Sequence, residues 1–441
     1  MQEKVDIIVK ADYVLKMDAD LTVISDGAVA IRNGKIISTG SDGEVSSRYS
    51  ADKILGGKGY VAFPGLVNTH THAAMVYFRG LGDDLPLKIW LEEHIWPAEN
   101  RWLSYEFVAE AAELACLEML KAGITTYNDM YFYGDAVAQS TRKLGMRAVI
   151  GAGILDFPSK TAKTSEEYFA NAENFISDWR GDDLIVPGIA PHSPYACSAE
   201  NIAKARKIAD RYGAPLHIHL SETEWEVSET KKRYGKTPVE LLYGIGFLDE
   251  RVTAAHCVWL TEREIAILSE KRVGVAHCIE SNMKLASGIA PVVKMLDAGI
   301  KVTFGTDGAA SNNNLDILSE MSTAAKVHKA VSGDPTAINS RQAMLMATRW
   351  GAEALGLGTI TGSIEEGKAA DIVTANLKKP HLTPLYDIFS HIVYSLNSSD
   401  IETVIVNGDV LLNGGRATAF DESEILANAV KWGIKIKHGD S

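Results

Sequence analysis

Eight short apolar runs, rich in β-branched residues, recur along the chain between residues 61 and 304. They lie at residues 61–67, 124–128, 147–150, 184–189, 215–220, 252–257, 272–276 and 301–304. Apolar runs of this length are typical of strands that are buried on both faces, as in a parallel sheet. The pattern therefore predicts eight buried strands.

Segments with helical spacing of apolar residues separate these strands, most clearly at 105–122, 166–179 and 198–212. Gly123 and Gly213 follow two of them where a C-cap favours glycine, and Thr164 precedes the third as an N-cap. Two more helices are expected at 315–331 and 340–355. Parallel strands joined by helices form right-handed βαβ units, so the fold class is α/β. Eight units predict a (β/α)₈ TIM barrel, while an open doubly wound sheet also fits the pattern.

Both ends of the chain show a different pattern, with short strands separated by turns. Short strands are expected at 6–9, 13–16, 27–32, 35–38, 371–375 and 403–406. Asn33-Gly34 and Asn407-Gly408 are signals for tight hairpin turns. We infer a small β-sandwich domain that combines residues 1–60 and 361–441, beside a barrel formed by residues 61–360.

Composition narrows the function classes. Of 441 residues, 46% are hydrophobic and 23% charged, as in ordinary globular proteins, and the net charge of −13 argues against binding nucleic acid through phosphates. The four cysteines form no Cys-x-x-Cys pair, the N-terminus lacks the apolar core of a signal peptide, and no run reaches the roughly 20 apolar residues of a membrane helix. We expect a cytoplasmic protein without a nucleic-acid or membrane partner, and the sequence leaves open whether it is a homo-oligomer.

Polar residues gather at the C-terminal ends of the predicted strands, where barrel enzymes carry their active sites. Seven of the twelve histidines follow or end five of these strands, and an aspartate follows the eighth strand. These residues are His70, His72, His192, His217, His219, His256, His277 and Asp307. Histidines of a core would have no reason to concentrate at strand ends, so we expect a functional cluster.

The cluster predicts a metal site. His70 and His72 lie two residues apart on one strand, so their side chains point to the same side. Together with His219 and Asp307 they supply three imidazoles and one carboxylate, a ligand set that suits one catalytic Zn²⁺ per subunit, with Fe²⁺ or Mn²⁺ as alternative ions. His217 shares the face of His219 but lies farther from the strand end, so we expect it one layer below.

The remaining histidines carry no comparable signal. His277 is expected either to support the cluster or to have a structural role. No role is predicted for the five that look like surface or helix residues, His94, His328, His381, His391 and His438.

Glu222 indicates which reaction the predicted metal site would catalyse. It follows His219 by three residues at the barrel mouth, where a carboxylate can move a proton between a metal-activated water and a substrate. His256 is expected to orient or polarise that water, and Asp307 both to ligate the metal and to accept a proton. The His-x-Glu and Pro-Cys-x-x-Cys pair of cytidine deaminases and the Gly-x-Ser-x-Gly elbow of serine hydrolases are absent from the sequence.

Several motifs resemble the amidohydrolase superfamily. They are the Pro-Gly-Leu-Val-Asn-Thr-His-Thr-His segment 64–72, His-Leu-Ser-Glu at 219–222, Ala-His-Cys at 255–257, Gly-Thr-Asp-Gly at 305–308 and the tail segment 366–372. The resemblance implies a metal-bearing barrel with a small β domain built from both termini. The chain offers no lysine at the fourth strand that could bridge two metals, so it resembles the single-metal branch.

Within that branch the chain looks like the family of 5'-methylthioadenosine/S-adenosylhomocysteine deaminases. Further motifs at 79–81, 87–91, 95–99, 191–195 and 281–289 carry this likeness. It implies that Trp90 packs on a nucleoside, Glu99 binds the ribose hydroxyls, His192 bonds a purine nitrogen and Glu222 protonates N1, with Asp307 also near the substrate. Water would replace the amino group at C6, giving an inosine derivative and ammonia in purine nucleoside salvage.

Two departures from the family pattern affect the expected substrate. The third strand leads into no arginine that could bind a homocysteine carboxylate; Lys160 or Lys163 would be a poorer clamp than a forked guanidinium. Smaller 5' groups, as in 5'-deoxyadenosine or 5'-methylthioadenosine, are therefore favoured. Cys278-Ile279 stands where the family usually has Asn-Pro, which could alter the pocket wall.

Two alternatives remain at this stage. A deaminase or chlorohydrolase of another aromatic heterocycle, such as guanine, cytosine or a triazine, would share the metal motifs. A homologue without catalytic activity is the other alternative, but the intact set of ligands and Glu222 argue against it.

Overall fold

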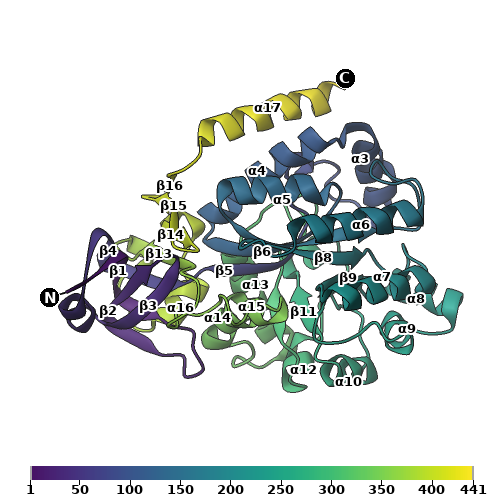
Figure 1. Ribbon diagram of the computed structural model, residues 1–441. Coiled ribbons are helices and arrows are strands. Elements are labelled where there is room, and N and C mark those ends of the chain that lie inside the picture. The colour runs from purple at the N-terminus through teal and green to yellow at the C-terminus, as the bar shows by residue number, and fades with distance from the viewer. Residues whose placement is uncertain (1, 440–441) are drawn as a thin grey trace.

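The computed structural model describes residues 2–439, and its central element is a barrel of eight parallel strands (Figure 1). The strands are β5 (Leu66–Thr71), β6 (Ile124–Tyr131), β7 (Arg147–Ile154), β8 (Ile185–Pro191), β9 (Leu216–Leu220), β10 (Val252–His256), β11 (Gly274–His277) and β12 (Val302–Phe304), in that spatial order. The last strand returns to the first: Thr69 Oγ1 bonds Thr303 Oγ1 at 2.7 Å, and the Asp307 amide donates to the His70 carbonyl at 3.0 Å. The predicted barrel is confirmed, and the doubly wound alternative is excluded.

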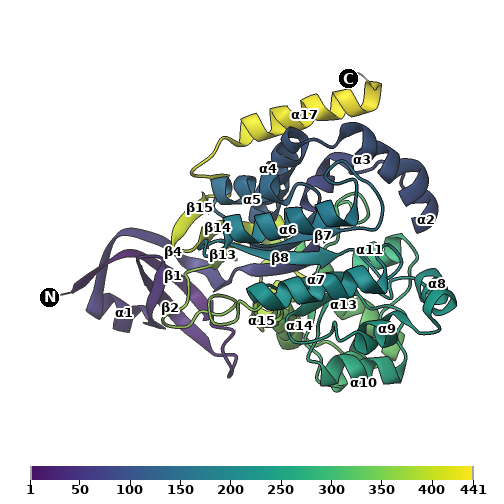
Figure 2. The same cartoon turned by 45° about the vertical axis from the view of Figure 1, so that its right-hand side comes forward.

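Helices surround the barrel (Figure 2). They include α4 (Tyr105–Lys121), α5 (Gly134–Leu144), α6 (Ser165–Trp179), α7 (Ala199–Tyr212), α8 (Glu224–Tyr234), α9 (Pro238–Gly244), α10 (Glu262–Glu270), α11 (Ile279–Lys284), α12 (Val292–Asp297), α13 (Ile317–Ser332), α14 (Ser340–Ala347) and α15 (Arg349–Ala354). Thr164 caps α6 by accepting the Glu167 amide, and Gly213 ends α7 in the left-handed region, as predicted. The single helix expected at 340–355 is wrong, because Thr348 leaves helical geometry and separates α14 from α15.

Several short helices lie between β5 and α4 or in the terminal segments. They are α1 (Asp42–Arg48), η1 (Ala73–Phe78), α2 (Leu87–Ile89), the π-helix η2 (Trp90–Ile95), α3 (Trp96–Trp102), η3 (Pro380–Leu382), α16 (Ile388–Tyr394) and η4 (Ser398–Asp400). Of these, α2, η2 and α3 form a continuous helical segment.

A separate, mostly antiparallel sheet combines the two ends of the chain, as predicted. Its strands, in spatial order, are β16 (Arg416–Ala417), β15 (Asp409–Asn413), β14 (Ile401–Val406), β13 (Ile372–Asn376), β4 (Tyr49–Pro64), β1 (Glu3–Leu15), β2 (Val23–Arg32) and β3 (Lys35–Ser41). Both hairpin turns are confirmed, because Asn33, Gly34, Asn407 and Gly408 all have positive φ.

The junction between the two sheets differs from the prediction. The strand expected at 61–67 is two strands: residues 61–64 end β4 and pair with β13 in the small sheet, whereas β5 of the barrel begins at Leu66. Gly65 lies between them, where a Cβ would come within 2.0 Å of Thr125 Oγ1. The runs at 6–9 and 13–16 likewise belong to one strand, β1, with an irregular register between Ala11 and Tyr13.

Buried charges join the small sheet to the barrel. Arg147, at the start of β7, pairs with Asp371 beside β13 at 3.0 Å, and both side chains are almost fully buried. The other oxygen of Asp371 accepts the Asn407 amide at 2.6 Å. The aspartate of the 366–372 motif therefore has a structural contact in this chain.

The C-terminal segment also supplies a long helix, α17 (Glu422–His438), that lies along the outside of the barrel (Figures 1 and 2). Its Trp432 is buried against Phe107 of α4, with ring centroids 5.0 Å apart, and its indole NH donates to Glu110 Oε2 at 2.5 Å. Among the described residues, no helix is long and apolar enough to cross a membrane. All four cysteines are buried and unpaired.

Candidate functional site

Four of the predicted side chains converge at the C-terminal rim of the barrel. His70 lies on β5, His72 directly after it, His219 on β9, and Asp307 just after β12. The ring nitrogens of the three histidines lie within 4.8 Å of one another. His72 Nε2 is 3.2 Å from His219 Nε2, and Asp307 Oδ1 is 3.3 Å from Nε2 of both His70 and His72. The structure thus brings together the four residues that the sequence suggested as metal ligands.

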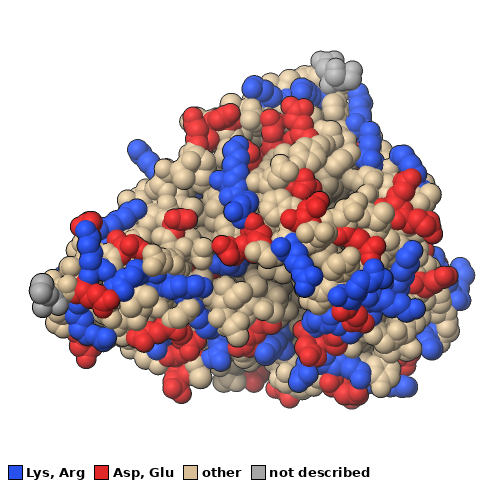
Figure 3. All heavy atoms as spheres, in the orientation of Figure 1, with Lys and Arg blue, Asp and Glu red and all other residues tan. Residues whose placement is uncertain are grey.

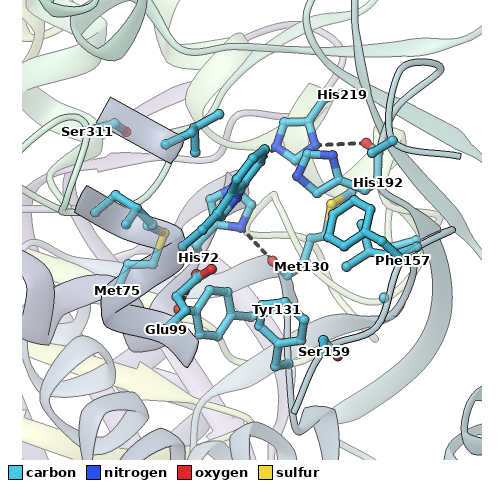
Figure 4. A pocket seen from close by; sticks show the side chains of 18 of the residues that line it. His72, Met75, Glu99, Met130, Tyr131, Phe157, Ser159, His192, His219 and Ser311 are labelled. Carbon is cyan, nitrogen blue, oxygen red and sulfur yellow. Dashed lines mark hydrogen bonds between the residues drawn. The ribbon is translucent and has the colours of Figure 1, made fainter. Parts of the chain in front are cut away.

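The hydrogen bonds of these imidazoles fit a bound cation. His72 Nδ1 donates to the Met130 carbonyl at 2.5 Å, and His219 Nδ1 donates to the His192 carbonyl at 2.9 Å (Figure 4). Because a carbonyl only accepts, each neutral ring then carries its lone pair on Nε2, and these lone pairs face each other. His70 Nε2 is also buried without a hydrogen-bond partner. Three inward lone pairs and a carboxylate suit a divalent metal with imidazole and oxygen ligands.

His217 lies beneath this cluster and supports it. Its Nε2 is 2.9 Å from His70 Nδ1, and burial lowers the pKa of His217 well below its usual value. A neutral His217 can accept the Nδ1 proton of His70, which leaves the His70 Nε2 lone pair free for a metal. The geometry agrees with the expectation that His217 occupies the lower layer.

Asp307 is held in place by two hydroxyls and one backbone amide. Ser281 and Ser311 each donate to Oδ2 at 2.7 Å, and the Gly308 amide donates to Oδ1 at 2.8 Å. Burial by itself would raise the pKa of Asp307, but its close contacts with the His70 and His72 rings outweigh it and hold the pKa well below its usual range. The carboxylate is therefore ionised, and its backbone is strained, with φ +59°.

Glu222 and His256 lie beside the cluster. Glu222 is buried, which raises its pKa; Ser287 donates to its Oε1 at 3.3 Å, and His256 Nε2 lies 3.8 Å from its Oε2. Asn282 Nδ2 donates to His256 Nδ1 at 3.0 Å, so His256 Nε2 carries a proton toward Glu222.

A second buried carboxylate fixes the loop that carries Glu222. Glu226 accepts the backbone amides of Ser221 at 3.1 Å and Glu222 at 2.8 Å. Ser221 has φ +51°, a strained conformation that these bonds help to maintain. The loop therefore presents Glu222 in a defined position.

The cluster opens into a cavity of about 480 Å³, within the range of small-molecule sites. Trp90 from η2, Glu99 from α3 and His192 after β8 all line it (Figure 4 shows the last two). Tyr131 donates to Glu99 Oε1 at 2.7 Å, and burial raises the pKa of Glu99 to about 7. Burial also lowers the pKa of His192 to about 3, so its ring is neutral. Every residue predicted to bind substrate thus lies on one cavity.

The outer end of the cavity is mainly apolar. The loop after β7 contributes Phe157, Pro158 and Lys160, and Trp96 and Trp225 complete the rim. Among the described lining residues Lys160 is the only lysine or arginine, whereas Lys163 is turned away and donates to the Ser159 carbonyl at 2.8 Å.

Cys278-Ile279, the second departure from the family pattern, lies outside the cavity. Neither Cys278 nor Ile279 is among the lining residues; the Cys278 thiol packs beneath the cluster, next to Gly305. His277 is buried and lies 2.9 Å from His328, Nε2 to Nε2. His328 is on helix α13, but it is buried rather than a surface residue.

The sequence predicted no role for three residues with clear contacts: Tyr131, Glu226 and Asn282, the last of which lies in the 281–289 motif. The second strand is predicted to end at residue 128, whereas β6 continues to Tyr131, so the position of Tyr131 at the true strand end is the signal for this partner of Glu99. Glu226 and Asn282 lie on helices after strand ends, and no spacing rule singles them out.

The chain matches the model of the amidohydrolase family over residues 61–411. It is 52% identical to a 5-methylthioadenosine/S-adenosylhomocysteine deaminase of Thermodesulfovibrio yellowstonii, over 98% of this chain and 99% of that protein. It is 47% identical to a 5'-deoxyadenosine deaminase of Methanosarcina acetivorans, over 96% of each. The crystal structure of an adenosine deaminase from Xanthomonas campestris with bound zinc superposes with a TM-score of 0.98 at 38% identity, over 99% of this chain and 100% of that one.

Proposed function

The chain belongs to the amidohydrolase family, and from this premise we propose that it is a zinc-dependent deaminase of 5'-modified adenosines. The observation that carries the proposal is that one cavity combines two chemically distinct groups of residues. A His/Asp cluster with Glu222 lies at its base, and Glu99 with Trp90 lies on its wall. The first set suits hydrolysis, and the second suits a ribose and a flat base.

His70, His72, His219 and Asp307 would hold one Zn²⁺ ion, with Fe²⁺ or Mn²⁺ as alternatives. When bound, such an ion supplies positive charge that polarises the substrate and lowers the pKa of water to about 7. The protein's contribution is orientation: Met130, His192 and His217 each engage the Nδ1 atom of one imidazole.

The proton transfers are assigned to Glu222. A buried carboxyl with a raised pKa can protonate N1 of the purine, which makes C6 more electrophilic, and can accept a proton from the attacking water. His256 orients that water through its Nε2 proton, and Asp307, which lines the same cavity, is a second acceptor. Addition of water at C6 and loss of ammonia then give the inosine derivative.

The remaining lining residues would hold the nucleoside. Trp90 offers an apolar surface for packing, and the ring nitrogens of neutral His192 can bond a purine nitrogen. Glu99, held by Tyr131, would accept hydrogen bonds from the ribose hydroxyls. The 5' position then meets Phe157 and the aromatic rim, which suit an uncharged substituent better than a zwitterionic one.

A substrate panel tests the proposal. Purified, zinc-loaded protein is incubated with 5'-deoxyadenosine, 5'-methylthioadenosine, S-adenosylhomocysteine and adenosine, and loss of adenine absorbance is followed. We expect the two substrates with small apolar 5' groups to have the highest kcat/KM. Turnover of guanine, cytosine or a triazine with none of the nucleosides would favour the alternative heterocycle, and no turnover of any nucleoside would contradict the proposal.

Glu99→Gln is expected to raise KM for the nucleosides by about tenfold, because a neutral amide is a weaker acceptor for ribose hydroxyls than a carboxylate. Hydrolysis of free adenine, which has no ribose, should change little and serves as the control. Equal losses with both compounds would contradict the ribose contact.

The same variant has an expected effect on stability. Burial raises the pKa of Glu99 from 4.5 to about 7, so its ionisation opposes folding. Relative to Glu99→Gln, the wild-type free energy of unfolding should fall as the pH rises from about 4.5 to about 7, by on the order of 3 kcal/mol. Denaturant unfolding at pH 5 and pH 8 measures this difference.

Lys160→Ala is expected to lower kcat/KM for S-adenosylhomocysteine by about three- to tenfold, because it removes the one cation near the 5' end from a partly solvated site. The value for 5'-deoxyadenosine should not change, since that substrate has no carboxylate. Lys163→Ala is the matched control, as Lys163 lies outside the cavity. Equal losses for both substrates would show that Lys160 does not recognise a carboxylate.

A further inference from the structure

The outer face of α17 carries a row of exposed aliphatic side chains. Leu426, Val430 and Ile434 are 52%, 62% and 55% exposed, and their spacing of four residues places them on one side of the helix. The opposite side holds Ile425 and Trp432, which are buried against the barrel. Large aliphatic residues repeated along one exposed helix face are characteristic of an interaction surface rather than of scattered surface residues.

The row is self-complementary about its centre. If two α17 helices cross antiparallel with Val430 on a two-fold axis, Val430 meets the partner's Val430, and Leu426 meets the partner's Ile434. Gly433 lies on the same exposed side, and no atom within 4 Å would contact a Cβ there, so it leaves room for close approach of a second helix. Such an isologous contact buries the complete row on both copies.

The charges of α17 favour the same arrangement. The first turn contains Glu422 and Glu424, and the last turn contains Lys435 and Lys437. Glu422 pairs with Lys121 and Lys435 lies over the Trp432 ring, so Glu424 and Lys437 are the charges of these turns that face a partner. In an antiparallel pair, the acidic first turn of each helix lies against the basic last turn of the other helix. The two helix dipoles are then also antiparallel, which is favourable. A parallel pair would set like charges together.

We propose that α17 is the centre of a two-fold interface between two copies of this chain, with Val430 at the axis. Figures 1 and 2 show α17 along the outer edge of the molecule, on the barrel rather than on the small sheet. On the face shown in Figure 3, acidic and basic side chains alternate without a large field of one sign, so no continuous charge on that face opposes close approach. The partner we propose is a second copy of this chain.

The α17 contact also reaches the segment that covers the cavity. Arg101 of α3 donates to the carbonyl of Gly439, just after α17, while Glu99 on the same short helix lines the cavity. Pairing of α17 would therefore restrain one end of the helical segment formed by α2, η2 and α3. This consequence follows from the proposed interface and does not depend on the proposed reaction.

Sedimentation of the 441-residue chain over a wide range of concentration tests the proposal. The wild type should sediment as a dimer or as a larger assembly of dimers, and Val430→Glu should weaken association at least tenfold by placing two carboxylates at the axis. Val331→Glu is the matched control, because Val331 on α13 is 66% exposed and lies outside α17. Circular dichroism and thermal unfolding establish that both variants are folded.

A cysteine variant tests the two-fold geometry. Val430→Cys should form an intermolecular disulfide rapidly under mild oxidation, because each thiol faces its own copy, and the four native cysteines are buried. Lys431→Cys, about 100° farther around the helix, and Val331→Cys should cross-link much more slowly. A monomeric wild type, a dimer that Val430→Glu leaves intact, or equal cross-linking of the three variants would each overturn the proposal. None of these readouts requires enzymatic activity, so failure here is distinguishable from failure of the proposed function.

Discussion

Replacing Glu222 with glutamine is expected to lower kcat by about 10²–10⁴-fold, the usual contribution of a positioned general acid or base. Glutamine keeps the size of the side chain and can still accept the Ser287 hydrogen bond, but it cannot release or take up a proton. The loss should therefore appear in kcat, with a smaller change in KM, while the metal content stays at the wild-type level. Steady-state kinetics with 5'-deoxyadenosine and elemental analysis measure the two quantities.

Glu224→Gln is the matched control for this prediction. Glu224 lies two residues farther along the chain and is exposed in the first turn of α8, so the same substitution there should leave kcat unchanged. A Glu222→Gln variant with wild-type kcat would show that another group, of which His256 is the nearest, carries the proton.

Removing the metal with a chelator is expected to abolish turnover and to lower the thermal unfolding temperature. Without a cation, His72 Nε2 and His219 Nε2 still lie 3.2 Å apart in a buried site, and the carboxylate of Asp307 lies beside them with no metal to bind. A ligand present at about 1,000 times its Kd stabilises the folded state by about 4 kcal/mol, so the shift should be easily measured. Adding Zn²⁺ back should restore both activity and unfolding temperature.

Two histidine variants separate metal binding from substrate binding. His219→Ala should lose both the bound zinc and the zinc-dependent shift in unfolding temperature. His192→Ala should keep the zinc and the shift, because the hydrogen bond that orients His219 comes from the backbone carbonyl of His192 and the His192 ring only packs on the His219 ring, yet it should raise KM for the nucleoside. Full activity in metal-free protein would contradict the proposed role of the cluster.

The sequence alone was enough to predict the barrel, the composite β domain and the rim on which the candidate site lies. Parallel strands of a barrel all end at the same rim, so residues that follow different strands come together whatever their separation in the chain. For this reason the sequence alone groups His70, His219 and Asp307, although His70 and Asp307 are more than two hundred residues apart. The hairpin turns at Asn33 and Asn407 could also be predicted, because they depend on local sequence alone: positive φ at two successive residues favours Asn-Gly.

Only the tertiary structure decided the features that depend on contacts between distant segments. The break at Gly65 results from close packing against Thr125, and the pairing of Arg147 with Asp371 spans two domains; periodicity carries no information on either. Periodicity also carries no information on the hydrogen bond from Tyr131 to Glu99 or on the one from Asn282 to His256. Hydrophobic pattern determines which face of an element is buried, but not which element covers it. The sequence therefore determined where the polar residues of the site would gather, whereas packing in three dimensions decided which neighbours orient them and which face of α17 is left exposed.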